Sequence, residues 1–229
     1  RLEHRRECWL AGAIDHHAAD GVVRNDALNR VPRDEPHVLH VVHVTHLGDR
    51  LEAGLGAPAE AQRGGGLVVD GLIYHCALLT EAEIGHLRLN EAGDTLESRC
   101  SGWAVDRRLR DYAYANGDSP LAKCLDGEGG EAQHLVKAMA DGDAGAKAIF
   151  DETCGELALG LSHVVHLINP VTIILGGGLS QIGEPLRLGV TTALERVIME
   201  VLKPGPSVCL AKLGEDAVPV GALILALNV

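Results

Sequence analysis

Two acidic residues and one histidine lie close together in the stretch EAEIGHLRLNEAGDTLES, where Glu83, His86 and Glu97 fall within fifteen residues of one another. Each carboxylate oxygen accepts hydrogen bonds from hydroxyl groups, and an imidazole ring can donate or accept one. Such a set can hold a metal ion, bind a polar ligand, or simply face water. The residue types and their spacing leave these three uses open.

A second group suited to chemistry is the glycine triplet in VTIILGGGLS, residues 171–180. The run VTIIL has no polar residue after its threonine, which predicts a strand buried on both faces of a mainly parallel sheet. We expect the triplet to turn the chain directly into a helix over 181–202. Such a turn binds phosphate when its backbone N–H groups approach an anion at a helix N-terminus. Alternatively, Gly176, Gly177 and Gly178 only permit a tight turn.

Regular elements that must position these groups follow from residue 64. GGGLVVDGLIYHC (64–76) has two apolar runs around a D-G turn, which predicts a β-hairpin. A long helix is expected from Asp143 to Asn169, since Pro170 stops it; its apolar stripe comprises Leu157, Leu161, Val164, Val165 and Ile168. The remaining expected elements are a helix over 101–116 capped by Ser101, a helix near 131–140, a strand over 208–213 and a closing helix over 218–227. Alternating helices and strands indicate an α/β domain.

Residues 1–62 differ from the rest, because seven of the twelve histidines lie there. Within this segment HVLHVVHVT (37–45) suits a strand, although H-V repeats also fit a helix and periodicity cannot decide between them. The histidines follow no ligand spacing supported by cysteine or carboxylate partners, so we expect them to be structural rather than metal ligands.

Charge and composition exclude several classes of function. The formal net charge of −12 and the lack of a Lys/Arg-rich run argue against nucleic acid and anionic membrane surfaces. No apolar run approaches the roughly 18–20 residues that span a bilayer, and RLEHRREC is not followed by a signal-peptide core, so we expect a soluble, cytoplasmic protein. The six cysteines form no C-x-x-C pair and are expected to be free thiols.

Five motifs in order resemble the ROK family of bacterial sugar kinases and sugar-sensing repressors. They are GGGLVVDG at 64–71, EIGH at 83–86, LES at 96–98 followed by CSGWAV, INPVTIILGGGLS at 168–180, and LGEDAVPVGALILA at 213–226. The resemblance implies an α/β fold of the actin/hexokinase (ribonuclease H-like) type. It also implies a sugar- and nucleotide-binding lobe over 63–229, preceded by a poorly matched segment 1–62 that we interpret as the remnant of an incomplete first lobe.

By this resemblance the activity is transfer of the ATP γ-phosphoryl group to a hexose hydroxyl, with ATP and Mg²⁺ as cofactors and a homodimer as the assembly. Glu83, His86 and Glu97 would then bind the sugar. The glycines of two turns would contact ATP, namely Gly64, Gly65, Gly66, Gly176, Gly177 and Gly178. The family's catalytic base is the aspartate of an N-D-A-N element. Asp26, in Asn25-Asp26-Ala27, is the matching position, although a chance tripeptide is the alternative.

Two departures from the family pattern alter these expectations. Typical members bind zinc through the E-x-G-H histidine and three cysteines, but LRLNEAGDTL between His86 and Glu97 contains no cysteine. We therefore expect no structural zinc, with packing by Trp103 in its place. The phosphate-binding D-x-G-G-T turn is not found in the sequence either, so we expect the chain to be slow or inactive as a kinase.

Three functions therefore remain open. The first is a glucokinase-like sugar kinase; the second is the sugar-sensing domain of a ROK-type transcriptional regulator; the third is a non-catalytic remnant that binds sugar. The motifs do not identify the sugar, because glucose, mannose and N-acetyl hexosamines share the hydroxyls that such residues contact.

Overall fold

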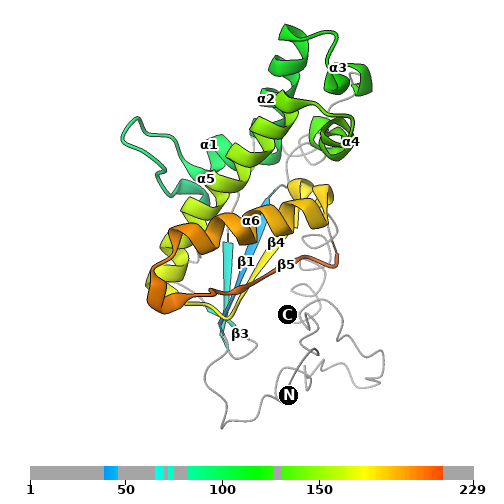
Figure 1. Ribbon diagram of the computed structural model, residues 1–229. Helices are drawn as coiled ribbons and strands as arrows, with labels where there is room; N and C mark the ends of the chain where they lie inside the picture. Colours follow the sequence, from blue (N-terminus) through cyan, green and yellow to red (C-terminus); the bar gives the residue numbers. More distant parts are fainter. Residues whose placement is uncertain (1–38, 46–64, 70–71, 75–81, 126–129, 214–229) are drawn as a thin grey trace, which may run out of the picture.

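The structure is a computed structural model and describes residues 39–45, 65–69, 72–74, 82–125 and 130–213. A five-stranded sheet in the order β3-β2-β1-β4-β5 forms its centre (Figure 1). The strands are β1 (Leu39–Thr45), β2 (Gly65–Val69), β3 (Leu72–Ile73), β4 (Thr172–Gly177) and β5 (Ser207–Leu210). β1, β4 and β5 are parallel, whereas β2 runs antiparallel to both β1 and β3.

The histidine-rich stretch forms β1, in the middle of the sheet. Its two neighbours settle the choice between strand and helix, since β1 pairs with β2 on one side and with β4 on the other. Residues from the segment 1–62 thus complete the sheet that the later strands build. The pairing of β2 with β3 confirms the expected hairpin, while its turn at 70–71 and the expected helix over 218–227 lie outside the described residues.

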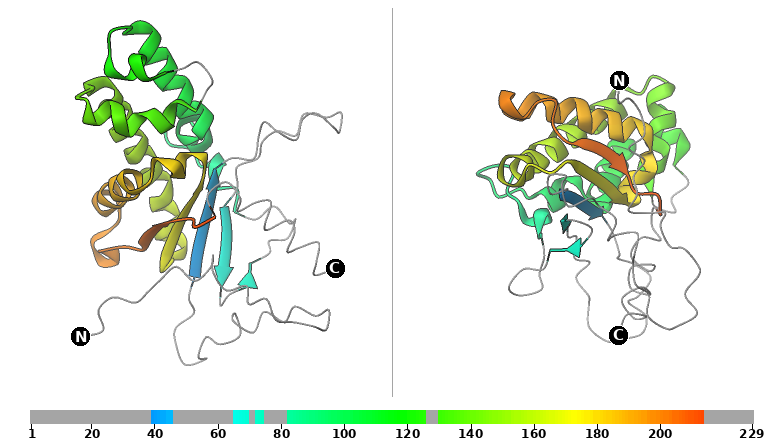
Figure 2. Two further views of the ribbon diagram at one scale, coloured as in Figure 1. Left: turned by 90° about the vertical axis from the view of Figure 1, so that its right-hand side faces the viewer. Right: turned by 90° about the horizontal axis from the view of Figure 1, so that it is seen from below.

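Helices precede and follow β4. The α-helices are α1 (Leu96–Cys100), α2 (Gly102–Ala115), α3 (Pro120–Cys124), α4 (Leu135–Ala140), α5 (Ala144–Ile168) and α6 (Glu184–Val197). Short 3-10 helices are η3 (Ile84–His86), η4 (Glu131–His134), η5 (Gly178–Ile182) and η6 (Glu200–Leu202). α5 and α6 pack against each other on one face of the sheet (Figure 2, left).

The long helix α5 begins and ends close to where the sequence predicts. Asp143 caps it by accepting hydrogen bonds from the backbone nitrogens of Gly145 (3.1 Å) and Ala146 (3.0 Å). Asn169 ends it in the left-handed conformation, with φ of 48°. The predicted apolar stripe is buried as far as Val165, but Ile168 is 37% exposed, so its predicted place in the core is wrong.

The predicted single helix over 181–202 is wrong. β4 continues to Gly177, the 3-10 helix η5 follows, and α6 starts only at Glu184, because Gly183 adopts φ of 78° and interrupts helical geometry. At its other end α6 stops before Ile198, whose extended conformation separates it from η6.

The core contact that fixes α1 is between Leu96 and α5. Leu96 is 1% exposed, and a Cβ atom added at Gly160 would lie only 2.7 Å from its Cδ1 atom. Gly160 therefore provides the space that Leu96 fills. Trp103, which we expected to pack in this region, is instead 43% exposed with the Arg107 guanidinium 5.0 Å from its ring centroid, so that expectation is wrong.

Two glycines of α5 make this contact testable. Gly155→Ala should raise the free energy of unfolding by about 0.5–1 kcal/mol, because alanine is the better helix former and nothing lies within 4 Å of its new Cβ. Gly160→Ala should lower it by about 1–2 kcal/mol, because crowding Leu96 costs more than the helix gains. Urea denaturation of both variants measures the difference. Equal stabilisation by the two substitutions would contradict the described contact.

Candidate functional site

The E-x-G-H segment is held against the start of β2. Gly65 donates its backbone N–H to the carbonyl oxygen of Ala82 at 2.7 Å. A Cβ atom added at Gly65 would lie 3.0 Å from Ile84 Cδ1 and 3.1 Å from the Ala82 oxygen. Gly65, which the family resemblance predicts as a nucleotide contact, has a packing role in the structure, since it lets η3 approach the strand.

Glu83 and His86 lie one turn apart and face each other. His86 Nδ1 is 3.5 Å from Glu83 Oε2, close enough for an ion pair when the imidazole is protonated, but the contact does not meet hydrogen-bond geometry. The His86 side chain is 68% exposed and that of Glu83 36%. Glu83 Oε2 itself is buried and accepts no hydrogen bond from the part of the chain that the structure describes. Within the described residues this oxygen thus has the nearby His86 ring but no hydrogen-bond donor, which is costly unless a donor is supplied.

Glu97 lies in the first turn of α1. Thr95 and Ser98 form a capping box at the start of this helix, with backbone-to-hydroxyl distances of 3.1 and 2.9 Å. The Leu96 nitrogen also donates to the Leu87 carbonyl oxygen at 2.9 Å. His86 precedes Leu87 and Glu97 follows Leu96, so this hydrogen bond brings the two predicted sugar-binding segments side by side.

The glycine triplet forms the turn at the end of β4. Gly176 and Gly177 are its last residues, and Gly178 is the first of η5. Gly177 has φ of 79° and ψ of −173°, a region open essentially to glycine alone. Ser180, buried, donates its hydroxyl to the Gly177 carbonyl oxygen at 2.6 Å and stabilises the turn.

Both predicted halves of the site occupy the same edge of the sheet. His43 on β1 pairs with Gly65 on β2 and with Leu175 on β4, so these three residues form one row across the sheet. Ala82, which precedes Glu83, is attached to this row by its hydrogen bond with Gly65. The glycine turn begins directly after Leu175. This is the edge where parallel strands end, the position at which α/β sheets bind ligands.

Of the other predicted residues, Gly66 lies within β2 opposite Val42. Gly64 and Asp26 lie outside the described residues. Within the described ranges, no group of three or more histidine, cysteine, aspartate and glutamate side chains is arranged to hold a metal ion. No helix of the described part is long and apolar enough to cross a membrane.

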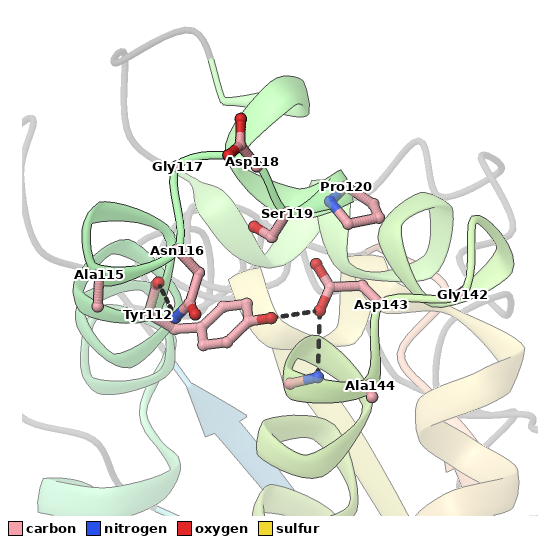
Figure 3. A pocket seen from close by; sticks show the side chains of 11 residues that line it. Tyr112, Ala115, Asn116, Gly117, Asp118, Ser119, Pro120, Gly142, Asp143 and Ala144 are labelled. Atoms are coloured by element: carbon pink, nitrogen blue, oxygen red, sulfur yellow. Dashed lines mark hydrogen bonds between the residues drawn. The ribbon is translucent and has the colours of Figure 1, made fainter.

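A separate cavity of about 460 Å³ lies between the end of α2 and the start of α5 (Figure 3). Its central carboxylate, Asp143, accepts hydrogen bonds from Tyr112 Oη at 2.7 Å, from the Leu121 nitrogen at 2.9 Å and from two nitrogens of α5. Burial acts to raise the pKa of Asp143, but these hydrogen bonds outweigh it and the pKa is lowered. Asp143 is thus fully used in holding helices together.

Sequence reasoning missed a group of four charged residues beside α1, namely Arg99, Arg108, Glu152 and Glu156. Each arginine contacts both glutamates. Two signals pointed to it, since Glu152 and Glu156 are one helical turn apart and Arg99 lies two residues after Glu97.

Comparison with known proteins gives consistent matches. A ROK family profile matches residues 62–229. The chain is 32% identical over 169 residues to a glucokinase of Thermotoga maritima and 29% identical over 177 residues to an N-acetyl-D-glucosamine kinase of Histophilus somni. These alignments cover 69% and 72% of this chain but 53% and 55% of the relatives. The chain thus spans about half the length of the curated relatives it matches.

Among solved structures, a ROK family glucokinase from Streptomyces griseus, in complex with glucose and AMPPNP, superposes with a TM-score of 0.67. The identity is 26%, and the match covers 83% of this chain and 61% of that one. This likeness confirms the predicted α/β fold of the actin/hexokinase type.

The geometry of the glycine turn leads to one prediction. Gly177→Ala should lower the free energy of unfolding by about 1–3 kcal/mol, because alanine at this φ and ψ is strained. Gly178→Ala is the matched control, since Gly178 lies in the 3-10 helix and its replacement should cost much less. Chemical denaturation compares the two variants, and an equal loss in both would show that the turn does not depend on the conformation of Gly177.

Proposed function

The chain belongs to the ROK family, and from this premise we propose that it acts in ATP-dependent phosphorylation of a hexose, with a glucokinase-like preference. One observation carries the proposal, namely that the E-x-G-H segment and the glycine turn share the edge where β1 and β4 end. Sugar and nucleotide must meet for the γ-phosphoryl group to be transferred. Sites at a common edge of the sheet would hold the sugar and the nucleotide close together.

In this proposal Glu83, His86 and Glu97 bind the sugar hydroxyls. The unused, buried acceptor on Glu83 supports such a role, because a hydroxyl donor would satisfy it. The imidazole of His86 is exposed on the same side and can donate or accept. Glu97 follows in the adjacent helix and supplies a second carboxylate.

Gly176, Gly177 and Gly178 would contact the nucleotide, together with the turn that includes Gly64, Gly65 and Gly66. The lack of side chains in the turn supports this at Gly178, which is partly exposed, whereas Gly176 and Gly177 are buried. ATP supplies the γ-phosphoryl group, and Mg²⁺ accompanies its phosphates. Asp26 is the proposed general base, accepting the proton of the attacking hydroxyl.

The sugar-binding half can be tested without turnover. Glu97→Ala should weaken binding of glucose or N-acetylglucosamine by about 1.5–3 kcal/mol, roughly 10- to 150-fold, because a hydrogen bond to a charged group is lost. Titration calorimetry of the full chain measures this. Glu91→Ala is the control, since it removes the same charge from an exposed position. Absence of sugar binding in the unmodified chain would contradict the proposal.

Turnover separates a kinase from a sugar-binding protein without catalysis. We expect slow ADP release at most with glucose, mannose or N-acetylglucosamine in a coupled assay, and Asp26→Asn should abolish what there is. Asp20→Asn serves as the control for loss of a nearby carboxylate. Turnover that is indifferent to Asp26→Asn would place the base elsewhere, while robust turnover would show that the phosphate-binding parts are complete.

A further inference from the structure

A closed ring of four charges joins α1 to α2 and α5. Arg99 Nε donates to Glu156 at 2.6 Å, and Arg99 Nη2 donates to Glu152 at 2.6 Å. Arg108 on α2 reaches the second oxygen of each glutamate, with 3.3 Å from its Nη1 atom to Glu156 Oε2. Two cations and two anions alternate, so the ring carries no net charge.

The ring is partly shielded from water, and this shielding decides how much its ion pairs contribute to holding α1 in place. Arg108, Glu156 and Arg99 are 16%, 19% and 29% exposed, whereas Glu152 is 53% exposed, so the shielded part of the ring is the Glu156 side. Isolated surface pairs contribute little, whereas forked arginine contacts in a shared network hold side chains in a fixed geometry. Arg108 Nη1 also donates to the backbone oxygen of Arg99 at 3.4 Å, which ties the end of α1 directly to α2.

α1 needs such attachment because it is only five residues long. A helix of this length does not persist alone in water. Three of its side chains contact α5. Leu96 and Cys100, each 1% exposed, pack beside Gly160 and Thr153, and Arg99 pairs with Glu156. Successive helical residues are about 100° apart, so Glu97 lies about 100° from Leu96 and about 160° from Arg99 around the axis. Holding Leu96 and Arg99 against α5 therefore limits the directions in which Glu97 can point.

We propose that the ring of Arg99, Arg108, Glu152 and Glu156 is the positioning device for Glu97, so that sugar affinity depends on Arg99 although Arg99 does not touch the sugar. This inference rests on the proposed function of Glu97 as a sugar contact. A carboxylate on a loosely held turn samples many orientations and loses affinity. The ring reduces that freedom before the sugar arrives.

The main test compares three variants of the full chain by titration with glucose and N-acetylglucosamine. Arg99→Gln should weaken sugar binding by about 5- to 20-fold, because a small displacement of the Glu97 carboxylate from its position against the sugar hydroxyl is costly. Arg99→Lys should recover part of the loss, because it keeps the positive charge. Recovery should be incomplete, because one ammonium group cannot bind both glutamates in the forked geometry of a guanidinium. Lys147→Gln breaks an exposed pair with Asp151 on the same helix α5 and should change nothing.

A double substitution separates positioning from general destabilisation. If Arg99 acts through Glu97, then Arg99→Gln added to Glu97→Gln should weaken binding no further than Glu97→Gln does alone. Additive losses, or unchanged affinity in Arg99→Gln, would overturn the inference while leaving the sugar site intact.

Hydrogen exchange of α1 provides a readout that needs no sugar. Arg99→Gln should speed amide exchange in residues 95–100 without changing exchange in the middle of α5. Faster exchange together with no sugar binding by the unmodified chain would refute the proposed function and, with it, the role in sugar affinity, but would retain the ring as the clamp on α1. Unchanged exchange over 95–100 would refute the clamp itself.

Discussion

The parallel pairing of β1 with β4 is the constraint on which the candidate site depends. Because both strands end at the same edge, the glycine turn after β4 is brought to the row that contains His43 and Gly65. The antiparallel β2 then starts at this edge, and its first residue holds Ala82 through a backbone hydrogen bond. Strand register and this hydrogen bond thus bring together two segments that lie about ninety residues apart in the sequence.

Much of this arrangement could be predicted from local signals. The start of the long helix near Asp143, its end before Pro170 and the apolar run of β4 each follow from a few neighbouring residues, and the structure confirms all three. Which strands end at the same edge of the sheet could not be predicted in this way. The strand at 39–45 has a pattern that also fits a helix, and only pairing with distant strands decides between them.

The incorrect or missing sequence predictions have a common physical origin. Trp103 was expected to pack in place of the family's zinc, yet burial depends on which face of α2 meets α5, and Trp103 is 43% exposed. The role of Leu96 could not be read from the sequence, because it depends on the missing side chain of Gly160, more than sixty residues away. The Arg99 ring likewise requires α1 and α5 to be adjacent. Sequence patterns identify the chemical groups, whereas the tertiary contacts that orient them come from packing.

Helix α5 links the two halves of the candidate site. On one side it supplies Glu152, Glu156 and the space at Gly160, which together hold the helix that carries Glu97. On the other side only three residues separate its end from β4, whose last residues form the glycine turn. A rigid helix transmits displacement along its length, and close packing leaves little room to absorb it. Any shift of α5 relative to the sheet would therefore change the separation between the proposed sugar contacts and the glycine turn. If the chain transfers a phosphoryl group as proposed, the transfer depends on that separation, so the packing of α5 on the sheet would constrain the chemistry as directly as the proposed ligand contacts.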